Sequence, residues 1–406
     1  MRRITLLLII FGKTILFGQT TLPQIVDTNT YHHELIFQSK GDIYSSSIQN
    51  IFINKLLFGG AISTNQISNS LSQQQNNNTL GIEGNVELEY RNHTIFPKKK
   101  WGVLVKTSMN TINSCHYTKD LFGLIFEGNE NYLGKPLQLN TSSLQSISYF
   151  KFGIGFIHKK TKSNYSINLF KIVNYISSSI DFGAIYVNDI SNLALLDFKG
   201  TSTSYLPSST QTNYGIGIDL DLRIPITSFS NKQIQLNILA KNFGIGFLTN
   251  DVHYYSIDTN YIFQGLTLNQ LGTLVGGKQN TDEQLKQLTI HSSNKIRFTP
   301  LLGFIQIEKM NTFQTHSRYQ SIFGIRMYPS LSYIPYLYTG IQVRCFQTLW
   351  IGLHENYGIT NSLRTGLYIK IIGKKIGVHI GTENLFDSFR QTGKGRSLQC
   401  RLQWYI

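Results

Sequence analysis

The sequence predicts an all-β fold, a transmembrane antiparallel up-and-down β-barrel of about fourteen strands with short helical insertions. Three observations predict it. Apolar residues recur at every second position in many segments, these segments are longer than ordinary strands, and only 15% of the 406 residues are charged. Because soluble proteins have about 25% charged residues, this composition fits a chain whose surface lies partly in lipid.

The clearest alternating segment runs from Tyr214 to Thr227. Apolar residues occupy every second position from Tyr214 to Ile226, and small residues, charged residues or proline lie between them. Successive side chains of a strand point to opposite faces, so one face of this strand is apolar throughout. Ordinary strands have about five or six residues, whereas a tilted strand needs about 9–11 residues to cross a bilayer. We therefore expect the apolar face to contact lipid.

The same alternation returns in residues 82–91, 150–156, 165–169, 337–344 and 363–370. It also fills the last residues, from Leu398 to Ile406, where we expect the strand that closes the barrel and serves as an assembly signal. Such strands usually end in an aromatic residue, and this one departs from that pattern at Ile406. Aromatic residues near the segment ends are expected to form girdles at the two membrane interfaces: Trp101, Tyr149, Tyr214, Tyr261, Tyr319, Tyr336, Trp350 and Trp404.

Two segments have apolar residues spaced by three or four positions, which indicates helix rather than strand. They are residues 120–133 and 269–288. We expect both to form short helices that cap the mouth of the barrel or enter it.

The N-terminus has the pattern of a cleaved export signal. Arg2 and Arg3 precede an apolar run that is too short to span a bilayer, and a small residue, Gly18, follows near a plausible cleavage point. We therefore expect residues 1–18 to be a signal peptide, residues 19–79 to be a lead-in segment with loops, partly inside the lumen, and residues 80–406 to be the barrel. No other stretch approaches the ~18 uninterrupted apolar residues of a membrane helix.

The net charge of +15 is compatible with several partners. Because we expect the chain to be exported, we do not expect it to bind nucleic acid. We expect the chain to lie in the outer membrane of a Gram-negative bacterium, in contact with its lipid and lipopolysaccharide and with the barrel-assembly machinery, and an envelope protein is a further candidate partner. A solvated basic surface explains the charge equally well.

Three stretches resemble an uncharacterised family of Bacteroidota outer-membrane barrels, which is similar to the fatty-acid-channel class and to the shuttle barrel of the type IX secretion system. They are GNENYLGKPLQLNTS from Gly128, KNFGIGFLTNDVHYYSIDTNYIFQGL from Lys241 and GLYIKIIGKKIGVHIGTENLF from Gly366. The chain differs from the residues that are common in the family, because it has Asn at 242 and Glu at 383 where the family commonly has Asp. The resemblance implies a lipid-handling or secretion-associated barrel and assigns no catalytic residues.

If the apolar faces contact lipid, the opposite faces line the lumen and collect most of the charges. Rings of such charges select ions or polar solutes in channels, whereas barrels of modest strand number are often filled by networks of paired side chains. Both interpretations stay open, and we favour the filled lumen. The candidate residues are Glu83, Glu87, Glu89, Asp219, Asp221, Arg223, Lys241, Arg326, Arg344, Arg364, Lys370 and Arg401.

No motif indicates catalysis. The three cysteines lie far apart in the sequence, and the sequence contains no nucleophile-elbow, zinc-protease or P-loop motif. His354 and Glu355 are adjacent, so in a strand they point to opposite faces and cannot act together. We expect no catalytic site, no metal and no cofactor. The leading function hypothesis is passage or handling of small or lipid-like molecules, and the alternative is a structural or secretion-associated barrel that binds an envelope partner.

Overall fold

The computed structural model describes residues 32–96, 100–128, 132–187, 194–205, 212–227, 233–249, 252–263, 297–300, 303–311, 318–328, 335–358 and 362–406. The expected signal peptide and the expected helix at residues 269–288 lie outside these ranges. Within them, no helix is long and apolar enough to cross a membrane.

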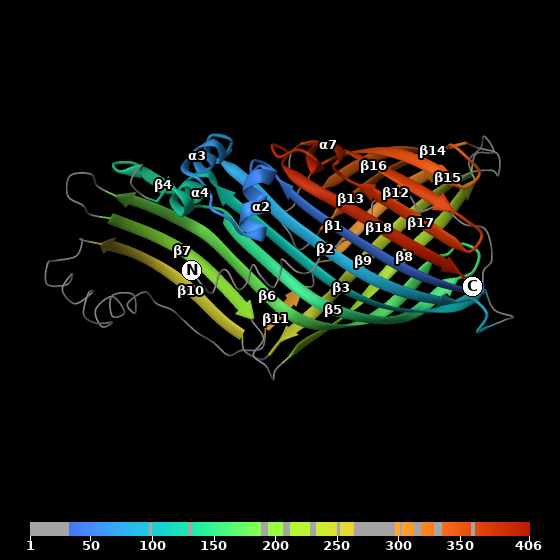
Figure 1. Cartoon of the computed structure of the whole chain (residues 1–406). Helices are drawn as coiled ribbons and strands as arrows, with labels where there is room; N and C mark the ends of the chain where they lie inside the picture. The colour runs from blue at the N-terminus through green and yellow to red at the C-terminus, as the bar shows by residue number, and fades with distance from the viewer. Residues whose placement is uncertain are drawn as a thin grey trace.

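Fourteen strands pair side by side in one closed antiparallel ring, which confirms the predicted barrel (Figure 1). Closure occurs at β1, which pairs with β2 on one side and with β18 on the other. In ring order, the strands are β1 (His33–Ser45), β2 (Asn77–Asn92), β3 (Trp101–Thr118), β5 (Ser142–His158), β6 (Asn164–Val187), β8 (Asn213–Thr227), β9 (Gln233–Leu248), β12 (Phe304–Asn311), β13 (Tyr319–Met327), β14 (Tyr336–Arg344), β15 (Leu349–Tyr357), β16 (Leu363–Ile372), β17 (Ile376–Thr382) and β18 (Gly395–Tyr405).

The barrel begins earlier than the sequence analysis expected. Residues 33–45 form a wall strand, although the barrel was placed at 80–406. Two helices follow β1, α2 (Asn50–Phe58) and α3 (Thr64–Ser72), and they lie at one end of the barrel rather than deep in its lumen (Figure 1). Phe52 of α2 packs there against Phe122 of a third helix, α4 (Lys119–Phe126), which confirms a helix in the segment 120–133.

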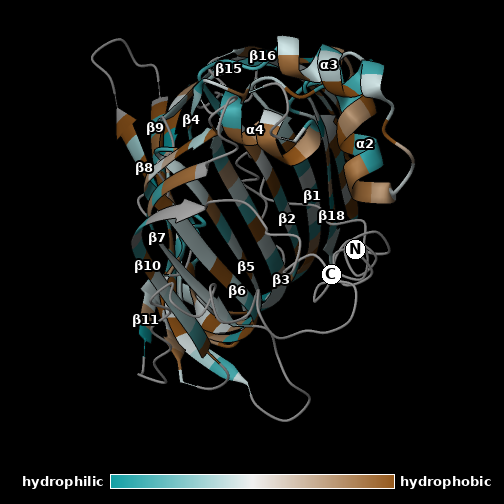
Figure 2. Ribbon diagram, turned by 90° about the vertical axis from the view of Figure 1, so that its left-hand side faces the viewer, coloured by the Kyte–Doolittle hydropathy of each residue, from teal (hydrophilic) through white to brown (hydrophobic). Residues whose placement is uncertain are grey.

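The alternation of each strand sorts its side chains between outside and inside. On β8, Ile216 and Ile218 are more than half exposed on the outer face, whereas Asp219 is 2% exposed on the inner face. Figure 2 shows the same alternation as bands of hydrophobic and hydrophilic colour along the strands. The outer surface of the barrel is therefore apolar, as expected for contact with lipid.

The expected aromatic girdles are correct only in part. Trp101, Tyr214 and Tyr319 are exposed on the outside, but Tyr149, Tyr336 and Trp350 are buried inside. Their inward direction follows from strand parity, since Ile351 and Leu353 take the outer positions beside Trp350 on β15. The side chain of Tyr261 lies outside the described residues, and that of Trp404 is half-buried.

The two ends of the barrel differ. At one end the connections are short, such as residues 159–163, 345–348 and 373–375. At the other end several are long: β1 and β2 are joined by residues 46–76, β3 and β5 by a stretch holding α4 and β4 (Pro136–Gln138), and β17 and β18 by a stretch holding α7 (Leu385–Ser388). We call the end with the short connections the turn end, and the other end the loop end.

Four strand segments branch from the ring. The first half of β6 pairs with β8, but from Tyr175 its partner on that side is β7 (Ala194–Tyr205), which in turn pairs with β10 (Val252–Phe263). On its other side, β6 stays paired with β5 as far as Ile180. These strands project at the loop end (Figure 1). β4 pairs with the far end of β6, and β11 (Arg297–Pro300) pairs with β9.

Inward tyrosine rings lie flat against the wall where the neighbouring strand has a glycine. A Cβ atom at the glycine would overlap the ring, so only glycine leaves room for it. The pairs are Tyr44 with Gly81, Tyr338 with Gly324, and Tyr368 with Gly352.

We expect Gly352→Ala to destabilise the barrel by about 1–3 kcal/mol, the usual range for overpacking, because the added methyl group displaces the Tyr368 ring. Urea unfolding in lipid vesicles measures the change. The control is Gly377→Ala, because the nearest atom to a Cβ there is 3.5 Å away and the glycine is also buried. Equal effects of the two substitutions would contradict the explanation.

Candidate functional site

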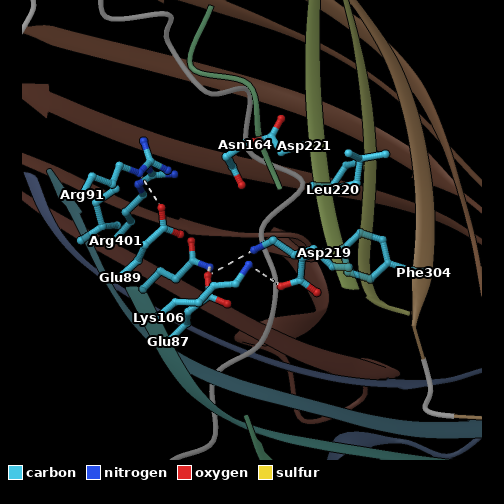
Figure 3. Close-up of a pocket in the computed structure, with 14 residues that line it drawn as sticks. Glu87, Glu89, Arg91, Lys106, Asn164, Asp219, Leu220, Asp221, Phe304 and Arg401 are labelled. Atoms are coloured by element: carbon cyan, nitrogen blue, oxygen red, sulfur yellow. Dashed lines mark hydrogen bonds and ion pairs between the residues drawn. The ribbon is translucent and has the colours of Figure 1, made fainter. Parts of the chain in front are cut away.

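The inner wall brings together five charged side chains from five strands, which we call the central cluster. Figure 3 shows three of them, Glu87, Lys106 and Asp219. The Lys151 ammonium lies 2.8 Å from the Asp219 carboxylate and 3.5 Å from the Glu87 carboxylate. Lys106 also contacts Asp219, and the Lys241 ammonium lies 3.3 Å from Glu87. Lys241 is 19% exposed, and the other four side chains are at most 2% exposed. Charged side chains that are buried this deeply need an opposite charge close by, and each side chain of the cluster has one.

A second cluster lies toward the turn end, around Glu34 of β1. The Glu34 carboxylate accepts a hydrogen bond from Arg91 at 3.3 Å and from Lys162 at 3.1 Å, and His93 contacts it at 3.1 Å. Arg91 also binds Glu89. Two strands, β1 and β2, and the turn that contains Lys162 are therefore held together beside the central cluster.

A third cluster lies toward the loop end, around Asp42 and Glu383. Arg364 donates two hydrogen bonds to Asp42, at 2.6 and 3.2 Å. Lys40 lies 3.3 Å from Glu383, whose other oxygen accepts a hydrogen bond from the Tyr336 hydroxyl at 2.9 Å. The partners come from opposite ends of the sequence, so this cluster joins the first strand to the last ones.

Nine of the twelve candidate charges are buried on the inner wall, and Asp221 is half-buried there. Lys241 is half-buried there. The exception is Arg344, which ends β14 at the turn end, is half-buried and donates a hydrogen bond to the carbonyl of Gln347 at 3.0 Å. Arg344 occupies an inward-facing position of β14, but it is the last residue of that strand and therefore lies at the end of the barrel rather than in its interior. Lys370, His379 and Arg401 form a row of neighbours across β16, β17 and β18.

Several buried charges were missed by the sequence analysis. Glu34, Lys40 and Asp42 lie on β1, where the outer positions include Ser39 and Gly41, so apolar alternation is weak. The sequence indicates the inward position of Lys106 and Lys151 more clearly. Each lies between two outward-facing residues, in a strand whose side chains alternate regularly between the two faces. Glu383 follows β17 in the loop, so strand parity gives no indication of it.

Toward the loop end, the inner wall carries a group of buried apolar residues, which we call the inner apolar cluster: Ile112, Ile147, Tyr149, Phe170, Ile172, Tyr205, Leu248, Val252, Phe304 and Tyr328. Phe304 also lines a cavity that reaches Glu87, Asp219 and Arg401 (Figure 3). The apolar cluster and the charged cavity are thus adjacent.

The pairing of the wall changes beside this cavity, on β9. β12 pairs with β9 up to Lys241 and β11 pairs with it from Ile245, so the residues between them pair with neither strand. On the other side, the register to β8 shifts at the same level. Asn242 adopts a left-handed conformation there, with φ of 57°, donates its backbone N–H to Asp219 at 2.6 Å, and accepts a hydrogen bond from Lys151 at 2.7 Å through its side chain. The central cluster therefore fixes the bulge.

Within the described residues, no group of three or more His, Cys, Asp or Glu side chains is placed to hold a metal ion. The expectations that the chain has no catalytic site, metal or cofactor stay predictions.

No protein-family model matches the chain, and no curated protein is similar to it in sequence. Among solved structures, the toluene transporter TodX of Pseudomonas putida matches with a TM-score of 0.37 at 8% identity, over 97% of this chain and 94% of that chain. The translocator domain of the autotransporter NalP from Neisseria meningitidis matches with a TM-score of 0.29 at 6% identity, over 94% and 91%. The ferric preacinetobactin receptor BauA from Acinetobacter baumannii matches with a TM-score of 0.29 at 7% identity, over 86% and 54%. At these scores the matches assign neither a family nor an activity.

We expect Asp219→Ala to destabilise the barrel by about 3–5 kcal/mol, the cost of breaking a buried ion pair, because Lys106 and Lys151 lose their shared carboxylate. Urea unfolding in lipid vesicles measures the loss. The control is Asp258→Ala, which breaks an exposed pair with Lys199 and should leave stability unchanged. A small effect at Asp219 would show that the charges are solvated instead.

Glu383 predicts a pH dependence. Burial alone would raise the pKa of its carboxyl, but Lys40 and Arg326 outweigh this and hold the pKa below its ordinary value of 4.5. A depressed pKa stabilises the folded state above pH 4.5, and this contribution is lost as the pH falls below that value. We therefore expect wild type to be more stable than Glu383→Gln at pH 7, with the difference shrinking below pH 4.5. A pH-independent difference in urea midpoint would contradict this.

Proposed function

We propose that this protein is an integral barrel of the bacterial outer membrane that binds and passes small apolar or lipid-like molecules, with its substrate unassigned. The observation that carries the proposal is the inner apolar cluster, which lies at the loop end of the lumen and borders the change in wall pairing on β9. Apolar side chains inside a barrel favour an apolar ligand over a hydrated ion. The resemblance to the fatty-acid-channel class supports the same ligand chemistry.

The charged clusters argue against a permanently open, water-filled channel. Their side chains are almost fully buried and pair between strands that are not neighbours in the ring. Lys241 of β9 also meets Glu87 of β2, five places away in the ring. This pairing favours the filled lumen over ion selection. A molecule that enters from the loop end would first contact the inner apolar cluster and then the central cluster. Passage therefore requires the clusters to rearrange or the molecule to leave beside β9.

A second candidate function is a secretion-associated or structural barrel that holds an envelope partner. The projecting sheet β6–β7–β10 favours it. β10 pairs with β7 along one edge, and its other edge is the place where a strand from a partner would extend this sheet. This function needs no open lumen.

Two measurements on purified protein separate these functions. In planar bilayers we expect no standing single-channel conductance from wild type. In proteoliposomes we expect uptake of a dansyl-labelled fatty acid, reduced about tenfold in Phe170→Ser, since ~1.4 kcal/mol of lost contact corresponds to a factor of ten. The control is Ile322→Ser, an equally buried residue of a different inner cluster.

Steady ion conductance in wild type would contradict the filled lumen. Absence of uptake, together with an envelope protein that co-purifies with wild type and is lost in Tyr255→Pro on β10, would reject passage and favour the second function.

A further inference from the structure

The connections at the turn end carry charged side chains of one sign. Lys and Arg are the only charged side chains in the connections made by residues 93–100, 159–163, 228–232, 312–318 and 373–375. The loop end differs, because exposed acids such as Asp181, Asp197 and Asp258 accompany its cations. The basic excess of the chain is therefore concentrated where the short turns lie.

Apart from buried ones such as Lys162, the described cations of the turn end are exposed or half-buried, and we call these together the basic rim: Lys100, Lys159, Lys160, Arg318, Arg344, Lys374 and Lys375. Lys159 donates a hydrogen bond to the carbonyl of Phe96 at 2.8 Å, and Arg344 donates one to a carbonyl of its own turn. None of these contacts involves an acidic side chain. The rim therefore presents positive charge that the described residues at this end do not neutralise.

Four turns of the rim also place a cation beside an outward apolar or aromatic side chain. Lys100 precedes Trp101, whose ring packs edge-on against Tyr165 at 5.8 Å. Arg318 precedes Tyr319, which is 61% exposed, and Lys375 precedes Ile376, which is 48% exposed. Phe346, two positions after Arg344, is 72% exposed. The cations therefore lie at the level where the apolar outer surface ends.

We propose that the basic rim binds the phosphate groups of anionic phospholipids in the leaflet that surrounds the turn end. Long cationic side chains beside an apolar belt reach the headgroups while their methylene stems stay in the apolar region. Aromatic rings at the same level are typical of a membrane interface. An acidic protein partner would account for the cations but not for their repeated placement beside lipid-facing side chains. The proposal rests on the membrane location proposed above.

The test is lipid selectivity. The protein is placed in phosphatidylcholine bilayers, and the association of spin-labelled phosphatidylglycerol is compared with that of spin-labelled phosphatidylcholine. We expect wild type to prefer phosphatidylglycerol by about two- to fivefold at low salt and less at 1 M salt, because salt screens exposed charges. The rim variant carries Lys160→Gln, Arg318→Gln, Lys374→Gln and Lys375→Gln, and we expect its preference to fall close to one.

The matched control removes the same number of charges at the loop end, by Lys119→Gln, Lys135→Gln, Lys199→Gln and Arg390→Gln, and should keep the preference of wild type. Equal association of both lipids with wild type, or an unchanged preference in the rim variant, would overturn the proposal. So would rim-dependent binding of an acidic envelope protein without lipid selectivity. Failure to insert into phosphatidylcholine at all, judged by protease protection, would instead reject the membrane location.

Discussion

The structure depends on one constraint, which is that every strand in a lipid environment needs a neighbour on both sides. An unpaired backbone amide or carbonyl finds no water in the hydrocarbon region, so a spanning sheet has to close. β1 provides the closure by pairing with β2 and β18. Once the ring is closed, the parity of each strand fixes which side chains face outward and which are enclosed.

Enclosure then determines the chemistry of the interior. Charges that cannot reach water have to meet opposite charges, and residues far apart in the sequence, such as Asp42 and Arg364, do so at short distance. The pairing has a local structural consequence at Asn242, whose left-handed backbone is held by Asp219 and Lys151. The same electrostatic network that fills the lumen thus shapes the wall beside it.

The sequence predicts the barrel class, its strand number and its outer face well, because lipid imposes a strict rule on outward residues such as Ile216 and Ile167. It predicts the interior less well, since the inner face accepts charged, aromatic and small residues alike. For that reason Trp350 is predicted to lie in a girdle although it points inward. β1 escapes prediction for a different reason, because Ser39 and Gly41 at its outer positions weaken the apolar alternation. The partners of each charge depend on register and on loops, as Glu383 illustrates, and periodicity contains no information on either.

The ion pair between Asp42 and Arg364 has a consequence for biogenesis. The first strand buries a carboxylate whose guanidinium partner is made only near the end of synthesis. A shortened chain that lacked the last strands would hold Asp42 without its counterion as well as leave β1 with an open edge. Completion of the barrel is therefore favoured twice, because an unfinished chain has an electrostatic penalty in addition to its missing hydrogen bonds.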